Sequence, residues 1–250
     1  MTGRTIAIGG RRAALEAIRA GRATEVLVAQ QARRTPAFRE LIAAASEAGV
    51  PVRESSREEL DRLAPDHHGA VARAHLPEEL TERELAGWPF GDDAFVVVLD
   101  GVDDPQNLGA AARSAEAAGA AMLVTRVHRA APVTPAAVRA SAGALLHLPH
   151  ARVANIARAL RRLQEAGFTV VGLDEHAEAS IHDERCPPGR LAIVVGSEGE
   201  GMARLTREAC DCLVRLPMHG RVGSLNASAS LAAVLYAYVL PSRRSKTPAR

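Results

Sequence analysis

Short apolar stretches that alternate with helical patterns constrain the fold of this chain most. The clearest of them are AFVVVLD at 94–100, AMLVT at 121–125, FTVVGLD at 168–174 and LAIVVG at 191–196. Strands that are buried on both faces have this near-continuous apolar character, and they occur almost entirely in parallel sheets covered by helices. We therefore predict an α/β domain with a parallel, two-sided sheet.

Helical patterns lie between these stretches and support this prediction. We expect helices over 106–119, 134–141, 153–167 and 224–240, and a further strand, CLVRLP, at 212–217. In such sheets ligands bind beyond the carboxyl ends of the strands. The loops that directly follow the strands are therefore the places where functional side chains are expected.

The first 76 residues form a separate small α/β pattern. Helices are predicted over 11–21, 35–49 and 56–64, and strands over 24–29, 51–54 and 69–75. The helix at 56 begins with Ser56 and has Glu59 three residues on, which is a capping box. Residues 77–92 are charged, contain Pro and Gly, and are interpreted as a linker or a docking segment. Trp88 and Phe90 within it are expected to pack against the second domain.

Charge is unevenly distributed along the chain, although the net charge is only +2. Residues 1–76 carry 12 arginines and nine acidic residues, whereas 77–240 carry 15 arginines and 20 acidic residues. The tail over 242–250 is basic. Both ends are therefore basic and the middle is acidic. Arginine makes up 30 of the 31 basic residues, a bias that a GC-rich genome can also produce.

Several classes of protein are disfavoured by simple counts. The longest apolar run, LAAVLYAYVL at 231–240, is half as long as the roughly 20 residues of a membrane helix. The three cysteines make neither a disulfide framework nor a CxxC zinc site, and the nine histidines show no HxH or HxxxH spacing. We expect a cytoplasmic protein with no membrane partner and no metal.

Two loops that follow strands carry unusual residues. DGVDDPQNLGAAAR at 100–113 begins a helix rich in alanine, which permits close approach of another backbone; a merely well-packed helix is the alternative. VVGSEGEGM at 194–202 is neither a GxGxxG motif nor a P-loop. Its Glu198 and Glu200 would repel a pyrophosphate, which disfavours a nicotinamide oxidoreductase. They are compatible with a positively charged ligand such as S-adenosylmethionine, and a plain tight turn is the alternative.

The third loop, LPMHGRVGSLNASAS at 216–230, places polar residues at the start of an apolar helix. Ser224 is predicted as the N-cap of that helix. Asn226, Ser228 and Ser230 would then lie in its first two turns, where such side chains compete with the helix backbone. Several such residues in one place suggest a polar surface that faces something other than solvent.

Taken together, three motifs resemble the SpoU family, the TrmH-type RNA ribose 2′-O-methyltransferases. They are NLGAAAR at 107–113, GSEGEGM at 196–202 and LPMHGRVGSLNASAS at 216–230, in the family's order and after strands. The resemblance implies a knotted catalytic (SPOUT) domain over 93–241, in which the C-terminal chain threads a loop as a deep trefoil knot. Residues 1–76 resemble the small L30e-like domain with which many members grip RNA.

The resemblance also implies roles for individual residues. The catalytic positions would be Asn107, Arg113, Glu198, Ser224 and Asn226. Backbone around Gly196, Leu216, Met218 and Leu225 would hold S-adenosylmethionine, and the polar turn at 224–226 would face this cofactor. Ser141 matches a further family segment and would meet substrate or an interface.

Arg113 is expected to bind the target nucleotide and to stabilise the developing alkoxide. An arginine base is chemically awkward, because the pKa of guanidinium lies above about 12. The proton acceptor stays open between a phosphate, a water and a desolvated arginine. Contacts with RNA are expected from Arg11, Arg12, Arg33 and Arg34, mainly to phosphates, because Phe38 is the only aromatic residue in the first block.

The expected function is methylation of a guanosine ribose in 23S ribosomal RNA by a homodimer. An adenosine ribose in the same RNA, as in thiostrepton resistance, is the second reading, and a tRNA guanosine the third. A non-catalytic RNA-binding or ribosome assembly factor is the alternative from another class. The 2′-hydroxyl is common to all four nucleotides, so the residues leave the base and the RNA open.

Overall fold

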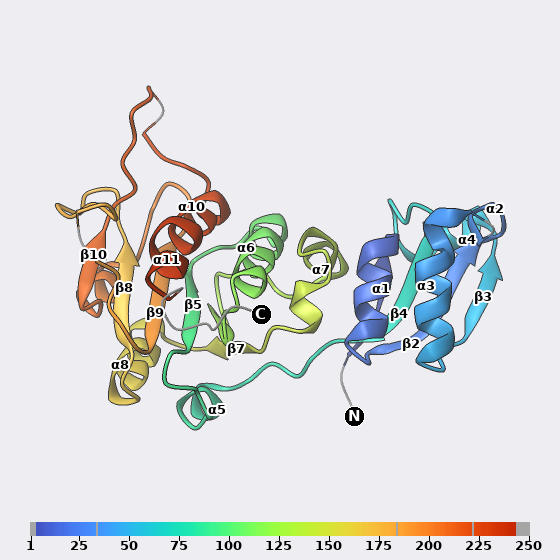
Figure 1. The fold of residues 1–250 in the computed structure, drawn as a ribbon, viewed down its shortest axis with the longest axis horizontal. Coiled ribbons are helices and arrows are strands. Elements are labelled where there is room, and N and C mark those ends of the chain that lie inside the picture. The colour runs from blue at the N-terminus through green and yellow to red at the C-terminus, as the bar shows by residue number, and fades with distance from the viewer. Residues whose placement is uncertain (1–3, 34, 184, 222, 244–250) are drawn as a thin grey trace. The chain divides into compact units, whose positions relative to one another are not determined.

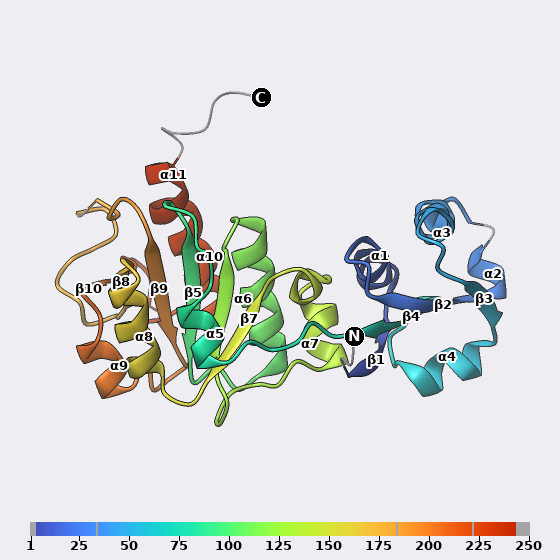
Figure 2. The same cartoon turned by 90° about the horizontal axis from the view of Figure 1, so that it is seen from below.

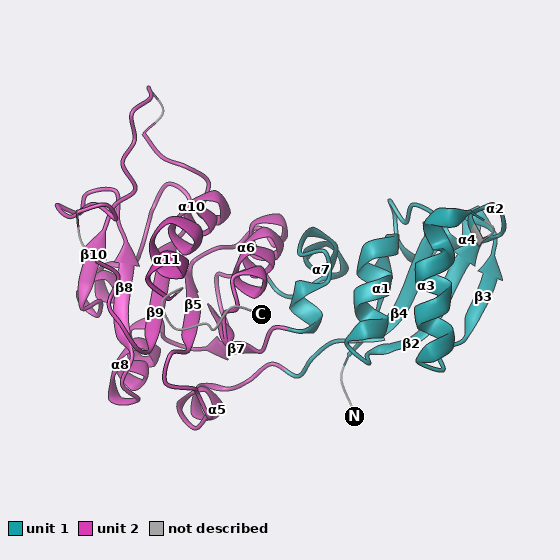
Figure 3. Ribbon diagram, in the orientation of Figure 1, with its two compact units in different colours: residues 1–78, 132–147 teal, residues 79–131, 148–250 magenta. Residues whose placement is uncertain are grey.

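The computed structural model describes residues 4–33, 35–183, 185–221 and 223–243. The chain divides into two compact units, coloured separately in Figure 3. Unit 1 comprises residues 1–78 and 132–147, and unit 2 comprises residues 79–131 and 148–250. Residues 132–147, which the sequence analysis assigned to the second domain, therefore group with the first 78 residues.

Unit 1 is built on a four-stranded sheet in the order β1-β4-β2-β3. Its strands are β1 (Thr5–Gly9), β2 (Ala23–Ala29), β3 (Val52–Ser55) and β4 (Ala70–His75). Its helices are α1 (Arg11–Arg19), α2 (Gln30–Arg33), α3 (Pro36–Glu47), α4 (Arg57–Leu63), α7 (Pro135–Ala140) and the 3₁₀ turn η1 (Ala144–Leu146). β4 runs antiparallel to β1 and β2, whereas β2 and β3 are parallel.

Helices cover both faces of this small sheet. Figure 2 shows α1 and α3 on one face and α4 on the other. On the α4 side, Leu60 packs with Leu27 and Val71 in a small buried cluster. One half of the predicted capping box is present, since the Ser56 side chain accepts a hydrogen bond from the Glu59 amide. The carboxylate of Glu59 accepts from Arg53 and Ser55 instead of the Ser56 amide. The first strand, β1, was missing from the prediction because TIAIG is too short to show a period.

Unit 2 contains a six-stranded sheet in the order β10-β8-β9-β5-β6-β7, and all its strand pairs are parallel. Its strands are β5 (Phe95–Asp100), β6 (Met122–Arg126), β7 (His150–Val153), β8 (Thr169–Leu173), β9 (Leu191–Gly196) and β10 (Cys212–Val214). Its helices are α5 (Glu82–Ala86), α6 (Pro105–Ala117), α8 (Ile156–Glu165), α9 (Arg204–Glu208), α10 (Ala227–Val234), the π-helical turn η2 (Leu235–Val239) and α11 (Leu240–Arg243). The predicted parallel α/β sheet is confirmed, whereas the knot stays a prediction.

The central strands β5 and β9 explain why this sheet forms. Every residue of both strands is buried, as the apolar runs predicted. Helices α6 and α10 pack together on one side of the sheet (Figure 1). α5 and α8 bury their apolar residues on the other side, together with Met122, Val170 and Val194. No helix in the described part of the chain is long and apolar enough to cross a membrane.

Residues 77–92, predicted as a linker or a docking segment, are docked from Glu79 onward in unit 2. Thr81 and Glu84 form a capping box at the start of α5. Leu85 is fully buried, and Phe90 meets Phe168 edge to face with ring centroids 4.8 Å apart. The predicted packing of Trp88 and Phe90 is confirmed.

Candidate active site

The candidate site lies where β5 and β9 end and where the chain enters α10. β5 and β9 are parallel neighbours, with Asp100 opposite Gly196, so the loops that follow them begin side by side. α10 packs against α6. This packing brings Asn226, before α10, next to Asn107 in the first turn of α6.

The loop after β9 folds back on itself as a tight turn. Ser197 and Gly201 exchange two backbone hydrogen bonds of 3.1 Å. A Cβ atom on Gly196 would lie 2.1 Å from the carbonyl carbon of Gly201, so only glycine permits this closure. Gly199 has a φ of +82°, a conformation that L side chains rarely adopt. The turn therefore holds Glu198 at its tip.

Asn107, Glu198 and Asn226 form one hydrogen-bonded group, which we call the amide–carboxylate trio. Oε1 of Glu198 accepts from Nδ2 of Asn107 at 2.8 Å and from Nδ2 of Asn226 at 2.6 Å. Nδ2 of Asn226 also donates to Oδ1 of Asn107 at 2.7 Å. Three of the five predicted catalytic residues are thus in direct contact, one from each motif.

The last helix begins later than the sequence analysis predicted. α10 starts at Ala227, and its N-cap is Asn226, whose Oδ1 accepts from the amides of Ser228 and Ala229. The prediction that Ser224 is the cap, and that the helix starts there, was wrong. Both residue types are good caps, and the hydrogen bonds of Asn226 to Asn107 and Glu198 select it. Ser224 instead lines the neighbouring pocket.

A pocket of about 390 Å³ opens beside the trio. Every residue predicted to hold the cofactor lines it: Gly196, Leu216, Met218 and Leu225. Its volume lies in the range of small-molecule sites, roughly 300 to 1,000 Å³. Gly196 and the Ser197–Gly201 turn present backbone to this space. Volume and lining therefore fit a nucleoside-sized ligand.

The charge of the pocket wall is mixed. Glu175, Glu198 and Glu200 line it, and so do Asp174 and Arg207, which form an ion pair of 2.7 Å. These carboxylates suit a ligand that carries positive charge, as S-adenosylmethionine does at its sulfonium and its ammonium group. Within the ranges that the structure describes, no cluster of His, Cys, Asp and Glu could hold a metal ion.

Asp100, at the end of β5, holds the loop after β9 through a hydrogen bond to its backbone. Its side chain is 1% exposed, and its Oδ2 accepts from the amide of Ala203 at 2.9 Å. Arg126 approaches Oδ1 at 3.6 Å. The turn that carries Glu198 is therefore fastened to the sheet by a buried carboxylate.

Arg113 is not part of the trio. It lies on α6 six residues after Asn107, which is roughly 9 Å along the helix axis. It is exposed and does not line the pocket. No hydrogen bond or ion pair engages its guanidinium within the described ranges. Arg113 is therefore available to a ligand outside the pocket, and its predicted catalytic role stays a prediction.

The predicted RNA-binding arginines belong to unit 1. Arg11 and Arg12 begin α1, and Arg11 donates to the carbonyl of Ala37 at 2.8 Å. Arg12 is exposed. Arg33 is the last residue of α2, and Arg34 lies outside the described residues.

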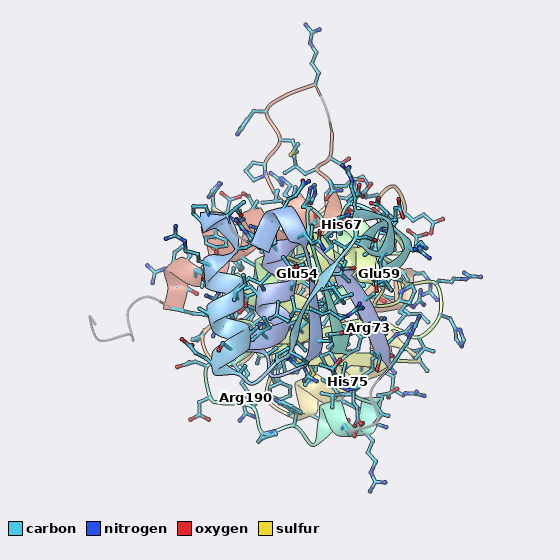
Figure 4. The ribbon with its side chains drawn as sticks, turned by 90° about the vertical axis from the view of Figure 1, so that its right-hand side faces the viewer. Glu54, Glu59, His67, Arg73, His75 and Arg190 are labelled. Atoms are coloured by element: carbon cyan, nitrogen blue, oxygen red, sulfur yellow. The ribbon has the colours of Figure 1, made fainter. Side chains whose placement is uncertain are left out.

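Other arginines of unit 1 are neutralised by neighbours. Arg53 pairs with Glu59 at 2.7 Å and with Glu25 at 3.2 Å, and Arg73 pairs with Glu25 at 3.3 Å; Figure 4 labels Glu59 and Arg73. Hydrogen bonds from Arg53 and Ser55 hold the pKa of Glu59 below its ordinary value. These ion pairs occupy Arg53 and Arg73, whereas Arg12 is exposed and has no ion pair among the described residues.

Ser141 does not face an open site. It is buried, its hydroxyl donates to the carbonyl of Val138 at 2.8 Å, and it accepts from the amide of Leu145 at 3.3 Å. Its hydrogen-bonding capacity is therefore used within unit 1. The expectation that it meets substrate has no support in this geometry.

The sequence analysis missed Asp100, Asp174 and Arg207. One signal could have found the two aspartates: VVVLD at 96–100 and VVGLD at 170–174 end alike, with an aspartate where a buried parallel strand stops. Ligands of such sheets bind at this edge. Arg207 lies on the short helix α9, which carries no periodic signal.

Two family models match the chain. The model of the SpoU rRNA Methylase family matches residues 94–236. The model described as RNA 2′-O ribose methyltransferase substrate binding matches residues 7–80. The first match spans all three residues of the amide–carboxylate trio and the whole pocket. The second spans α1 to α4, β2 to β4 and the last three residues of β1.

A curated protein and two solved structures show the same likeness. The 23S rRNA (guanosine-2′-O-)-methyltransferase RlmB of Vibrio cholerae is 41% identical over 191 residues, which cover 75% of this chain and 77% of that protein. A crystal structure of an RNA 2′-O ribose methyltransferase matches with a TM-score of 0.81 at 31% identity, covering 97% of this chain and 90% of the other. The SpoU methyltransferase AviRb from Streptomyces viridochromogenes, solved with AdoMet, matches with a TM-score of 0.77 at 27% identity and covers 97% and 92%.

Proposed function

Because the chain belongs to the SpoU rRNA methylase family, we propose that it methylates the 2′-oxygen of a guanosine ribose in 23S ribosomal RNA. It is an RNA 2′-O-methyltransferase, and S-adenosylmethionine is its methyl donor. The amide–carboxylate trio beside a nucleoside-sized pocket carries the proposal.

When bound, the cofactor supplies a methyl group attached to a sulfonium, and the neutral thioether that remains after transfer is a good leaving group. The residues of this chain therefore act mainly by positioning the reactants. Gly196, Leu216, Met218 and Leu225 would hold the donor from the pocket wall. Glu198 and Asn226 of the trio line this pocket, and the trio would orient the target ribose toward the bound donor.

Arg113 is proposed to bind the target nucleotide and to stabilise negative charge on the 2′-oxygen as its proton leaves. Its exposed guanidinium, outside the pocket, is consistent with a contact to RNA rather than to the donor. Arginine remains protonated under ordinary conditions, because its pKa lies above about 12. We therefore assign it charge stabilisation and not proton removal.

Unit 1 is proposed to bind the RNA substrate. The substrate-binding family model covers residues 7–80, and the exposed Arg12 offers a phosphate contact. The relatives at about 40% identity that bear the name 23S rRNA (guanosine-2′-O-)-methyltransferase favour that RNA and that base. We place the protein with this RNA in the cytoplasm.

A homodimer is the proposed assembly. Tyr236, in the C-terminal helical segment η2, is 53% exposed. Tyrosine is enriched at protein–protein interfaces relative to the rest of the surface, which supports a partner on this segment. Light scattering of the purified protein tests this: a mass twice the chain's 26.4 kDa supports the dimer, and a monomer contradicts it.

The function is tested by methyl transfer from tritiated S-adenosylmethionine. The purified protein is incubated separately with unmodified 23S ribosomal RNA and with unmodified tRNA, and labelled riboses are mapped. Label at one guanosine of 23S RNA is expected. Label at an adenosine or in tRNA would support 2′-O-methylation of RNA but contradict the proposed substrate nucleotide. Failure to bind S-adenosylmethionine would overturn the proposal itself.

A further inference from the structure

The pocket has a charged end that the trio does not use. In the sheet order, β9 lies between β5 and β8. Asn107 follows β5, whereas Asp174 follows β8 directly. Asp174 therefore follows the strand on the other side of β9 from Asn107, and it lines the pocket together with its ion-pair partner Arg207.

The carboxylate of Asp174 is occupied by the protein. Its side chain is 4% exposed, Oδ2 lies 2.7 Å from Nη2 of Arg207, and Oδ1 accepts from the amide of His176 at 2.8 Å. A buried carboxylate held from both oxygens is poorly placed to accept from a ligand. Its effect is to fix one edge of the Arg207 guanidinium.

Arg207 keeps donors free for a second partner. Its side chain is 42% exposed although Asp174 is buried. A guanidinium has five N–H groups in a fixed fork, and the ion pair with Asp174 uses one edge of it. In the part of the chain that the structure describes, no other acceptor engages the guanidinium of Arg207. The remaining N–H groups stand at the pocket wall.

The charge balance of the wall indicates what Arg207 binds. Arg207 is the single arginine or lysine among the described lining residues, against Asp174, Glu175, Glu198 and Glu200. His176 is the only other cationic candidate, and it lies 3.6 Å from Glu175. An anionic group on a ligand would therefore find one permanent positive charge in this pocket.

We propose that Arg207, oriented by Asp174, binds the α-carboxylate of the cofactor's amino-acid tail and so selects donors that carry it. The inference rests on the proposed function, because it takes the pocket to be the S-adenosylmethionine site. Guanidinium and carboxylate match as planar, paired partners. Ribose hydroxyls are neutral, so a permanently charged arginine in the pocket wall favours a contact with the carboxylate of the tail over a contact with the sugar.

Two ligands that differ by the carboxylate alone test the inference. S-adenosylhomocysteine and its decarboxylated analogue share adenine, ribose, thioether and amine. Their dissociation constants are measured by titration calorimetry with the full-length protein. We expect the wild type to prefer S-adenosylhomocysteine by roughly tenfold or more, the usual effect of a charge-assisted hydrogen bond pair.

Arg207→Met should abolish this preference by weakening S-adenosylhomocysteine while leaving the decarboxylated analogue almost unchanged. Arg207→Lys, which keeps the charge and loses the fork, should retain part of it. Arg204→Met is the matched control, since Arg204 lies on the same helix, pairs with Glu208 and does not line the pocket. It should keep the full preference.

The outcomes separate this inference from the proposed function. Equal weakening of both ligands in Arg207→Met would overturn the tail assignment and point to a nucleoside contact or a structural role. Should Arg207→Met fail to fold, Asp174→Asn combined with Arg207→Met removes the unpaired charge and must still lose the preference. A preference of the wild type for S-adenosylhomocysteine that Arg207→Met abolishes and Arg204→Met retains supports the inference. A wild type that binds neither ligand refutes the proposed function.

Discussion

Asn226 holds Glu198 with one side-chain atom and caps a helix with the other. Its Nδ2 donates to Oε1 of Glu198 at 2.6 Å, while its Oδ1 accepts from the amide of Ser228 at 2.8 Å. The start of α10 and the geometry of the trio thus depend on one amide group. This double use explains why a polar turn precedes the most apolar helix of the chain.

The two roles of Asn226 can be separated by substitution. Asn226→Ser keeps a good N-cap and loses the amide that meets Glu198. We expect stability close to wild type and methyl transfer reduced roughly tenfold or more, the effect of losing a hydrogen bond to a charged group. Asn226→Ala should reduce transfer equally and also cost about 1 kcal/mol of stability. Urea unfolding and tritium transfer measure the two effects, and full activity of Asn226→Ser would contradict the trio's role.

Arg113→Lys keeps the charge of the side chain and removes the guanidinium fork. Because Arg113 is exposed and lies outside the pocket, binding of S-adenosylmethionine should be unchanged. Methyl transfer to RNA should fall by roughly tenfold or more. Calorimetric binding and single-turnover transfer check the two halves. A variant that methylates at the wild-type rate would show that the planar donor role is wrong.

Asp100 should matter for stability and for the pocket together. Asp100→Ala removes the acceptor for the Ala203 amide and the partner of Arg126, so the free energy of unfolding should fall by about 1–3 kcal/mol. Asp100→Asn retains one oxygen for Ala203 and should lose less. Cofactor affinity should fall in the same order, since the loop after β9 lines the pocket. Equal losses in both variants would mean that the charge of Asp100, rather than its hydrogen bond, holds the loop.

His150 should make stability depend on pH. Burial, and to a lesser extent Arg152, lower the pKa of His150 to about 4 from its ordinary value of 6.5. Between pH 6.5 and about pH 4, His150 binds a proton in the unfolded chain but not in the folded chain. The free energy of unfolding therefore falls as the pH decreases over this range. The expected slope approaches 1.4 kcal/mol per pH unit.

Comparison with His150→Gln isolates this contribution from the carboxylates that titrate in the same range. Gln can still meet the Thr125 hydroxyl, which lies 2.8 Å from Nε2 of His150. Between pH 7 and 5 the wild type should lose more stability than the variant. Parallel curves of unfolding free energy against pH would show that His150 does not remain neutral in the folded protein.

Arg12→Glu tests the contact of unit 1 with RNA. Removing one phosphate contact should weaken RNA binding and reduce the slope of log affinity against log salt by about 1. Binding of S-adenosylmethionine should not change. Arg57→Glu is the control, since Arg57 is an exposed arginine of the same unit on α4. Identical effects of both substitutions would show only a general loss of positive charge.

The continuous apolar runs were sufficient to predict the parallel sheet of unit 2, because strands that are buried on both faces consist almost entirely of apolar residues. Short elements were missed. β7 (His150–Val153) was not predicted, and the helix predicted over 153–167 begins at Ile156 with Asn155 as its cap. The five residues of α9 are too few for a helical period, so Arg207 carried no signal.

The sequence by itself predicted which loops form the candidate site, since it places polar motifs after buried strands and in a fixed order. Only the tertiary structure decided which of their residues meet. Asn107 and Glu198 are 91 positions apart, and Asn226 follows 28 later, so their contact depends on the pairing of β5 with β9 and the packing of α10 on α6. The choice of Asn226 over Ser224 as the helix cap follows from the same contacts, because local propensity favours both residues about equally.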